Sequence, residues 1–237
     1  MQKKFFTILL SILALHNIYS QQSANDFLSS GNKKQEELKF KEAIEDYNKA
    51  IKLEPENEMA FYYRANARFD MEDYKAALLD YDVCIQIKHD FIHAYFNRGN
   101  TYYEMDEYQK AIDDFTKTLS FDSTYFDSYF DRANAYFKIK DYKKSIQDFD
   151  SGLRLDPKNA NGYYDRGNAF FYLEKFEDSL RDYNQAIKLN NGNAIYYFNR
   201  AIVKINLDLV EEGCSDLKKA EQLGDTDAKE YIKEICP

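Results

Sequence analysis

The chain has 237 residues and a formal net charge of −9, with 21 tyrosines, 18 phenylalanines and no tryptophan. This acidic balance argues against nucleic acid as a partner, because nucleic acid favours dense lysine and arginine patches. Glycine and proline are scarce, at 8 and 3 residues, so the many aromatic side chains must occupy recurring packing positions or a binding surface.

The first twenty residues are typical of a secretory signal peptide. Lys3 and Lys4 precede an apolar run at 5–15, and the segment ends on the small residue Ser20. The run is short for a permanent membrane span, although an uncleaved N-terminal anchor is the alternative. We therefore predict an exported protein, periplasmic or secreted, that starts near Gln21. Loss of the two lysines takes its net charge from −9 to −11.

The rest of the chain, 21–237, is predicted to form one domain of six repeats. The clearest sign is a motif that returns every 34 residues, as YYRAN at 62–66, FNRGN at 96–100, FDRAN at 130–134 and YDRGN at 164–168. Taking Ala24 as position 1, the repeats are 24–57, 58–91, 92–125, 126–159, 160–193 and 194–227. Residues 228–236 are expected to form one more helix that caps the last repeat.

Each repeat shows the periodicity of two amphipathic helices. Positions 4, 8 and 11 share one helical face, and positions 17, 20, 24 and 27 share another. A tight turn near positions 15–16 is expected to join the two helices. Turn-forming segments such as LEPEN at 53–57 and LDPKN at 155–159 separate the repeats. The sequence thus predicts an all-α fold.

These residues resemble the tetratricopeptide repeat family. The period, the small residues at positions 8 and 20 and the aromatic residues at positions 17 and 24 all fall in register. The resemblance implies a right-handed α-solenoid of stacked helical hairpins with a concave groove. It also implies a non-catalytic scaffold that binds a protein or peptide.

An arginine at position 7 is followed sixteen residues later by an aspartate in five repeats. We expect five structural ion pairs within repeats, because a partly buried arginine needs a partner. The alternative is a ladder of arginines that captures an acidic ligand. The pairs are Arg64 with Asp80, Arg98 with Asp114, Arg132 with Asp148, Arg166 with Asp182, and Arg200 with Asp216.

Positions 5, 9 and 12 are expected to line the inner face of the stack. An asparagine recurs at position 9, flanked by aromatic residues at positions 5 and 12. Exposed amides can bond the backbone of an extended peptide, so we predict that these residues bind a partner. They are Tyr62, Asn66, Phe69, Phe96, Asn100, Tyr103, Phe130, Asn134, Phe137, Tyr164, Asn168 and Phe171.

Structural alternatives remain open for this face. The amides can instead bond the neighbouring repeat or simply be solvated, and the aromatic residues can pack on adjacent repeats. The partner is expected to be neutral or basic, since Asp131 and Asp165 would repel an acidic tail. The family's clamp for the carboxylates of chaperone tails lacks its basic residues here. The second interpretation of the whole chain is a structural or self-associating solenoid with no separate ligand.

No residues suggest an enzyme, a cofactor or a metal centre. His89 and His93 are four residues apart, but they straddle a junction between repeats and no acidic or cysteine cluster joins them. Three cysteines are present. Cys84 occupies a core position and is expected to be buried and free. Cys214 and Cys236 are the candidate disulfide, since the helices that carry them should pack together.

Overall fold

The computed structural model describes residues 23–236, and within that range every regular element is a helix. The prediction of an all-α repeat fold is confirmed. Residues 23–36 are helical. The helices that follow are α2 (Phe40–Leu53), α3 (Glu58–Asp70), α4 (Tyr74–Ile87), α5 (Ile92–Glu104), α6 (Tyr108–Phe121), α7 (Phe126–Lys138), α8 (Tyr142–Leu155), α9 (Ala160–Tyr172), α10 (Phe176–Leu189), α11 (Ala194–Asn206), α12 (Val210–Gln222) and α13 (Ala228–Ile235).

The first helix of each repeat from the second to the sixth begins at position 1. Asparagine side chains fix three of these starts by accepting hydrogen bonds from the exposed backbone N–H groups of the first turn. Asn57 accepts from Met59 and Ala60, and Asn159 accepts from Gly162 at 2.9 Å. Asn193 accepts from Ile195 at 3.2 Å. The turn segments recognised in the sequence therefore end on helix caps.

The turn between the two helices of a repeat is the same in all six repeats. Position 15 adopts the left-handed conformation each time, with φ between 57° and 64°. In α3, the N–H of Asp73 donates to the carbonyl of Arg68 and the N–H of Glu72 donates to that of Phe69. This pair of bonds is the Schellman motif, which satisfies the last carbonyls of a helix. None of the six residues is a glycine; they are Leu38, Glu72, Asp106, Lys140, Glu174 and Asp208.

Close packing of small residues against large rings forms the interior of the first five repeats. The aromatic side chain at position 24 is almost fully buried, as for Tyr183 at 1% exposure. Its ring lies against the small residue at position 8 of the paired helix. A Cβ atom added to Gly167 would lie 2.8 Å from the Tyr183 ring, so the two helices approach too closely there for a larger side chain.

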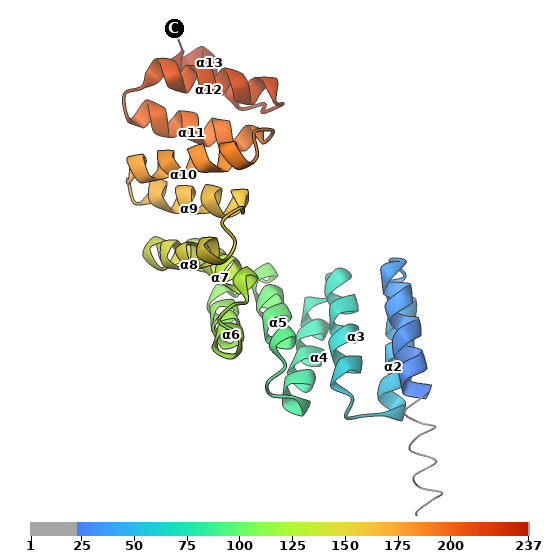
Figure 1. Cartoon of the computed structure of the whole chain (residues 1–237). Coiled ribbons are helices and arrows are strands. Elements are labelled where there is room, and N and C mark those ends of the chain that lie inside the picture. Colours follow the sequence, from blue (N-terminus) through green and yellow to red (C-terminus); the bar gives the residue numbers. More distant parts are fainter. Residues whose placement is uncertain (1–22, 237) are drawn as a thin grey trace, which may run out of the picture. The chain divides into compact units, whose positions relative to one another are not determined.

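The described chain divides into two compact units, of which unit 1 runs to Lys117 and unit 2 begins at Thr118. Within unit 1, α2 packs against α3 and α4 against α5. Within unit 2, each of the helices α8 to α12 packs against the next one along the chain, as Figure 1 shows. At the C-terminal end α13 packs on α12, with Ala228 fully buried. The ring of Tyr231 lies 5.1 Å from that of Phe198, so α13 covers the last repeat.

Candidate functional site

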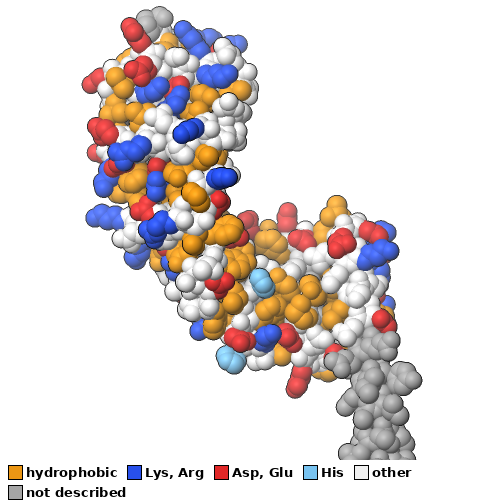
Figure 2. Space-filling view, viewed as in Figure 1, with side chains coloured by type: hydrophobic (Ala, Val, Ile, Leu, Met, Phe, Trp, Pro, Cys, Tyr) orange, Lys and Arg blue, Asp and Glu red, His pale blue; other side chains and the backbone are white. Residues whose placement is uncertain are grey.

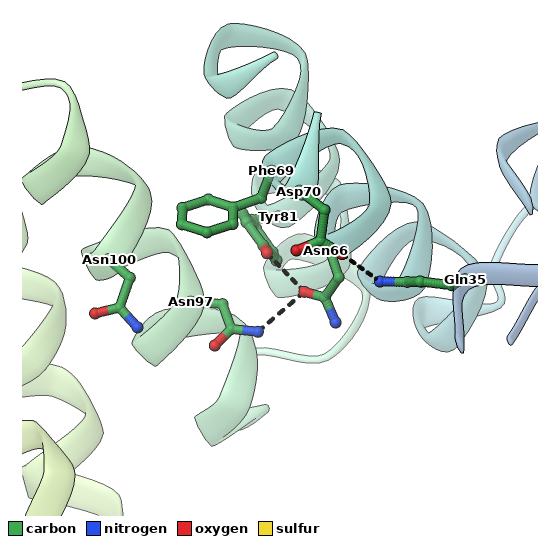
Figure 3. A pocket seen from close by; sticks show the side chains of 7 residues that line it. All are labelled: Gln35, Asn66, Phe69, Asp70, Tyr81, Asn97 and Asn100. Carbon is green, nitrogen blue, oxygen red and sulfur yellow. Dashed lines mark hydrogen bonds between the residues drawn. The ribbon is translucent and has the colours of Figure 1, made fainter. Parts of the chain in front are cut away.

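Three helices of unit 1 are joined by a hydrogen-bonded group of four side chains, which we call the unit 1 bridge. It consists of Tyr62 and Asn66 on α3, Tyr81 on α4 and Asn97 on α5. The oxygen Oδ1 of Asn66 accepts from the Tyr81 hydroxyl at 2.6 Å and from Nδ2 of Asn97 at 2.9 Å (Figure 3). Asn97 also donates to the Tyr62 hydroxyl at 3.1 Å. Burial raises the pKa of Tyr62, and a hydrogen bond from the Asn66 side chain partly offsets that rise. The Nδ2 group of Asn66 carries two N–H donors, so at least one of them has no acceptor within residues 23–236.

The same arrangement returns three repeats later as the unit 2 bridge, made of Tyr164, Asn168, Tyr183 and Asn199. The Tyr183 hydroxyl donates to Oδ1 of Asn168 at 2.7 Å, and Nδ2 of Asn199 donates to it at 3.3 Å. Asn199 also donates to the Tyr164 hydroxyl at 2.8 Å. Burial raises the pKa of Tyr164, and a hydrogen bond from the Asn168 side chain partly offsets that rise. As in unit 1, at least one of the two Nδ2 donors of the position-9 asparagine has no acceptor in the described part of the chain.

A cavity adjoins the bridge in each unit. The unit 1 cavity has a volume of about 300 Å³ and a mainly polar lining. Beyond Asn66, Tyr81 and Asn97 of the bridge, it is lined by Gln35, Phe69, Asp70 and Asn100 (Figure 3). Gln35 donates to Asp70 at 2.8 Å, whereas Asn100 has no hydrogen-bond partner among residues 23–236. This cavity therefore presents amides to a ligand.

The unit 2 cavity is more aromatic, with a volume of about 290 Å³. Beyond Tyr164, Asn168, Tyr183 and Asn199 of the bridge, it is lined by Phe137, Phe171, Tyr172 and Ile202. Tyr172 is 58% exposed, and its ring lies 5.4 Å from the ring of Phe137 and 5.8 Å from that of Phe171. None of the lining residues is charged. The shape and lining of this cavity suit an apolar side chain that lies beside a backbone carbonyl group.

The twelve residues predicted to bind a partner are divided by the structure. Seven line the two cavities, namely Asn66, Phe69, Asn100, Phe137, Tyr164, Asn168 and Phe171. Tyr62 belongs to the unit 1 bridge and packs 5.0 Å from Phe91. Phe96 packs on Phe115, and Tyr103 on Tyr108. Asn134 is half-buried on α7 and makes no hydrogen bond within the described residues.

Phe130 differs from the expected placement on the inner face, because it lies in the core at 8% exposure. Its ring packs 6.3 Å from that of Phe149. Gly152 and Gly162 leave the space that it fills, since an added Cβ atom would approach the Phe130 ring to 2.9 Å and 2.6 Å respectively. Because these two residues have no side chain, the Phe130 ring can occupy the core of unit 2 and stabilise it.

Sequence reasoning missed four bridge residues, namely Tyr81, Asn97, Tyr183 and Asn199. The sequence contains a signal for them. Tyrosine occupies both position 5 and position 24 in repeats 2 and 5, and asparagine occupies position 6 in the repeat that follows each of them. Repeats 3 and 4 hold phenylalanine at both positions, and aspartate follows at position 6. Hydroxyl groups and amides therefore occur together, as a hydrogen-bonded bridge requires.

The position-7 arginines are held in bidentate ion pairs within their repeats. Nε and Nη2 of Arg166 lie 2.7 Å and 2.6 Å from the two carboxylate oxygens of Asp182. The other four pairs have the same geometry at 2.6–2.8 Å, namely Arg64 with Asp80, Arg98 with Asp114, Arg132 with Asp148, and Arg200 with Asp216. These guanidinium groups are bound by the protein itself, which is the structural role rather than the ligand-capturing one.

A third nitrogen of these arginines joins neighbouring repeats. Nη1 of Arg166 donates to Asp150 of the preceding repeat at 2.6 Å, and Nη1 of Arg98 donates to Asp82 at 2.6 Å. The first repeat has Ser30 in place of the arginine, and Lys34 supplies the charge to Asp46 at 2.6 Å. Burial opposes ionisation of Asp46, but hydrogen bonds from Lys34, Ser30 and Lys49 outweigh it and lower its pKa to about 2. Each repeat thus keeps its buried carboxylate paired.

Two further aspartates on first helices have no partner. Asp131 on α7 and Asp165 on α9 are half-buried at position 6, and neither forms a hydrogen bond or ion pair within residues 23–236. Burial raises the pKa of Asp165 to about 6. Burial, with repulsion from Asp127, raises the pKa of Asp131 to about 7. Both carboxylates are therefore costly to ionise in the free protein.

Cys214 and Cys236 are joined by a disulfide with a Cα–Cα distance of 5.7 Å, which links α12 to the end of α13. Cys84 is a free, buried thiol, and burial raises its pKa to about 12, which keeps it protonated. His89 and His93 are exposed. Histidine side chains are visible at the surface in Figure 2.

Neither a metal centre nor a membrane span is found in the part of the chain that the structure describes. No three histidine, cysteine, aspartate or glutamate side chains within residues 23–236 are placed to share an ion. The helices of the same range are too short or too polar to cross a bilayer.

Comparison with known proteins places these features in a recognised family. A family model of the tetratricopeptide repeat matches residues 93–125, and a TPR repeat model matches 38–71, 133–173 and 167–207. Together the matched segments cover more than half of the chain. The search of curated proteins gave no match.

Solved structures of the same fold share little sequence with the chain. The pilF protein of Pseudomonas aeruginosa has a TM-score of 0.75 at 14% identity, covering 91% of this chain and 99% of its own. YrrB, a TPR protein with an unusual peptide-binding site, has a TM-score of 0.70 at 19% identity, covering 79% and 97%. A tetratricopeptide repeat protein from Parabacteroides merdae has a TM-score of 0.62 at 23% identity, covering 90% and 82%.

Proposed function

Because the chain belongs to the tetratricopeptide repeat family, we propose that it is a non-catalytic scaffold that binds an extended peptide or protein segment. Each unit offers its own binding surface, which consists of its cavity and the position-9 asparagine beside it. YrrB, which has the same fold, contains a peptide-binding site. The neutral, aromatic lining of the unit 2 cavity and the net charge of −9 favour a neutral or basic partner.

One observation carries this proposal. In both bridges, two donors engage Oδ1 of the position-9 asparagine and fix its amide next to a cavity, with at least one of its two Nδ2 donors left without an acceptor in the described residues. Fixing the amide in this way lowers the entropy lost when a ligand binds, because the donor is already oriented. A backbone carbonyl of an extended peptide is the acceptor that this donor fits, and every peptide supplies it whatever its sequence.

Binding can be tested with an array of immobilised octapeptides of varied sequence. We expect the purified chain to bind a subset rich in apolar residues. The variants Asn168→Ala and Phe171→Ala should weaken binding to that subset by about tenfold each, as expected for loss of roughly 1.4 kcal/mol. Asn206→Ala is the matched control, because this exposed asparagine bonds only the carbonyl of Ile202 in its own helix.

Two outcomes would contradict the scaffold proposal. One is equal binding of the same peptides by Asn168→Ala, Phe171→Ala and the unaltered chain. The other is an absence of peptide binding together with concentration-dependent association in sedimentation experiments, which would favour a self-associating solenoid instead.

We also propose that the protein is exported, with residues 1–20 as a cleaved signal peptide. This segment lies outside the described residues, so the support is its sequence together with the disulfide between Cys214 and Cys236. Disulfides persist in oxidising compartments and are rare in the reducing cytosol. Mass spectrometry of the protein from fractionated cells should find a chain that starts near Gln21 with that disulfide oxidised. A cytosolic chain that retains Met1 and has reduced cysteines would refute the proposal.

A further inference from the structure

Position 6 has two different chemical roles in the repeats. In repeats 3 and 6 the residue is asparagine, and Asn97 and Asn199 donate hydrogen bonds to the preceding repeat in the two bridges. In repeats 4 and 5 the residue is aspartate, and Asp131 and Asp165 form no hydrogen bond or ion pair in the described chain. The same place in the fold therefore carries a stabilising amide twice and an unpaired acid twice.

In the repeat before Asp165, no hydroxyl group stands at the positions of the bridge tyrosines. The repeat before it carries Phe130 and Phe149 where the bridges have tyrosines, and both rings are buried at 8% and 1% exposure. Asn134, at the position of the bridge asparagines, makes no hydrogen bond within residues 23–236. Here the carboxylate gains no donor to offset its loss of hydration, and burial raises its pKa to about 6. An asparagine would avoid this cost, because its amide has no charge to desolvate.

Asp165 does not line the unit 2 cavity itself, but it lies on α9 three residues before Asn168, which does, so the two side chains are neighbours on the helix surface. It follows Tyr164 in α9, and the same helix supplies Asn168 and Phe171 to the lining. Its charge reaches the cavity tyrosines, since it adds to the effect of burial in raising the pKa of Tyr164 and of Tyr183. No lysine or arginine lines the cavity. A negative group thus lies beside an apolar space with no cation to balance it.

We propose that Asp165 binds a lysine or arginine side chain of an extended peptide, and that a neighbouring apolar side chain of this peptide fills the unit 2 cavity. Asp131, one repeat earlier, binds a second basic side chain of the same peptide. This inference rests on the proposed peptide-binding function and specifies its ligand class. A basic side chain supplies the counter-charge and the donors that the chain withholds from these carboxylates. The energy that the acids cost in the free protein is then recovered on binding, which makes the basic residue a determinant of specificity.

The test measures a preference for charge rather than binding alone. The probes are octapeptides selected on the array that contain one arginine, each paired with the same peptide carrying glutamine or glutamate instead. We expect the full chain to bind the arginine peptides about tenfold more tightly than the glutamine peptides. Asp165→Asn should reduce this ratio to about one while leaving the affinity for the glutamine peptides unchanged. Asp131→Asn should lower the ratio for arginine placed at a different residue of the peptide.

Glu177→Gln is the control, because Glu177 is an exposed acid in the first turn of α10. This change removes one negative charge from unit 2 and should leave the arginine preference intact. An arginine preference that survives both Asp131→Asn and Asp165→Asn would overturn the inference while leaving the proposed function standing. Glutamine and arginine peptides bound equally by the unaltered chain would do the same. Failure of every peptide to bind would overturn both.

Discussion

Single residues hold the repeats together through the position-7 arginines. Arg166 forms three hydrogen bonds to two carboxylates, one in its own repeat and one in the repeat before. The Asp182 side chain is only 5% exposed. Arg166→Ala would leave that carboxylate buried and unpaired, so we expect the free energy of unfolding to fall by about 3–5 kcal/mol. Urea denaturation followed by circular dichroism measures this loss.

The control for this change is Arg181→Ala. Arg181 pairs with Asp178 at 3.0 Å, but its side chain is 75% exposed. Exposed ion pairs contribute about 0–1 kcal/mol, so the variant should remain close to the unaltered protein. A similar loss of stability in both variants would show that the arginine at position 7 has no special structural role.

The unpaired acids predict how stability depends on pH. Asp131 and Asp165 have pKa values raised to about 7 and about 6, from an ordinary value of 3.8. Between pH 4 and 7 the folded chain therefore binds more protons at these sites than the unfolded chain does. Their ionisation thus lowers stability as pH rises through that window.

The double variant Asp131→Asn, Asp165→Asn removes this term. Its midpoint of thermal unfolding should match that of the unaltered protein near pH 4 and exceed it increasingly towards pH 8. At the upper end of this range, the free energy of unfolding of the double variant should exceed that of the unaltered protein by about 1–3 kcal/mol per site. Melting curves across this range measure the difference. A constant gap between the two proteins at every pH would mean that the carboxyls titrate normally.

The contacts of single residues could be predicted best where two residue types that can pair recur at a fixed spacing. Arginine and aspartate recur sixteen residues apart, and the structure places them in contact. Prediction was weakest where the environment varies between repeats. Position 5 is aromatic in Tyr62, Phe96, Phe130 and Tyr164, yet these side chains lie in different surroundings. Phe130 is buried because Gly152 and Gly162 leave space for its ring. Tyr164 belongs to the unit 2 bridge because its hydroxyl accepts a hydrogen bond from Asn199.

At the scale of the helices, the turn within each repeat contains strain that substitution can release. Lys140 has φ of 64° in the Schellman turn between α7 and α8. The left-handed region costs a residue with a Cβ atom about 1–2 kcal/mol, whereas glycine adopts it freely. We expect Lys140→Gly to raise the free energy of unfolding by about 1 kcal/mol. Urea denaturation at pH 7 measures the gain.

A glycine placed elsewhere should have the opposite effect. Lys143→Gly is the matched control, because Lys143 is an exposed residue inside the first turns of α8. Glycine in a helix costs about 0.8–1 kcal/mol relative to alanine. Loss of stability in both variants would show that the turn is not strained.

The helices were predictable because their limits are set locally. The turn segments and the 34-residue period located the starts at Glu58, Ile92, Phe126, Ala160 and Ala194, where the structure has them. The Schellman turns were not predictable in detail. Their usual marker is a glycine at the left-handed residue, and here Glu72, Lys140 and the equivalent residues occupy it. Hydrogen bonds to the end of the first helix and packing of the second helix enforce a conformation that these residue types disfavour.

At the scale of the whole molecule, stability is expected to be local. Within each unit the repeats pack on their neighbours along the chain, and stacked repeats of this kind have stabilities that are sums of repeat and nearest-neighbour terms. The bridges fit this description, since each spans two adjacent repeats and lies inside one unit. A disturbance at one end of the chain should therefore fade within about one repeat.

The disulfide between Cys214 and Cys236 allows that expectation to be measured. Its two cysteines are 22 residues apart, and closing a loop of this size stabilises the folded state by about 3 kcal/mol. Reduction should loosen α13, whose eight residues otherwise pack through Ala228, Ile232 and the contact of Tyr231 with Phe198. Hydrogen–deuterium exchange should then rise in α13 and α12.

Exchange in α9 and in the helices of unit 1 should stay unchanged on reduction, because α13 packs on α12 and its Tyr231 ring contacts α11. The variant with Cys214→Ser and Cys236→Ser should reproduce the pattern without reductant, which separates the effect of the disulfide from any effect of reductant on the buried Cys84. Faster exchange across α2 to α4 after reduction would instead require cooperative unfolding of the whole chain. That result would be inconsistent with nearest-neighbour stability in this array.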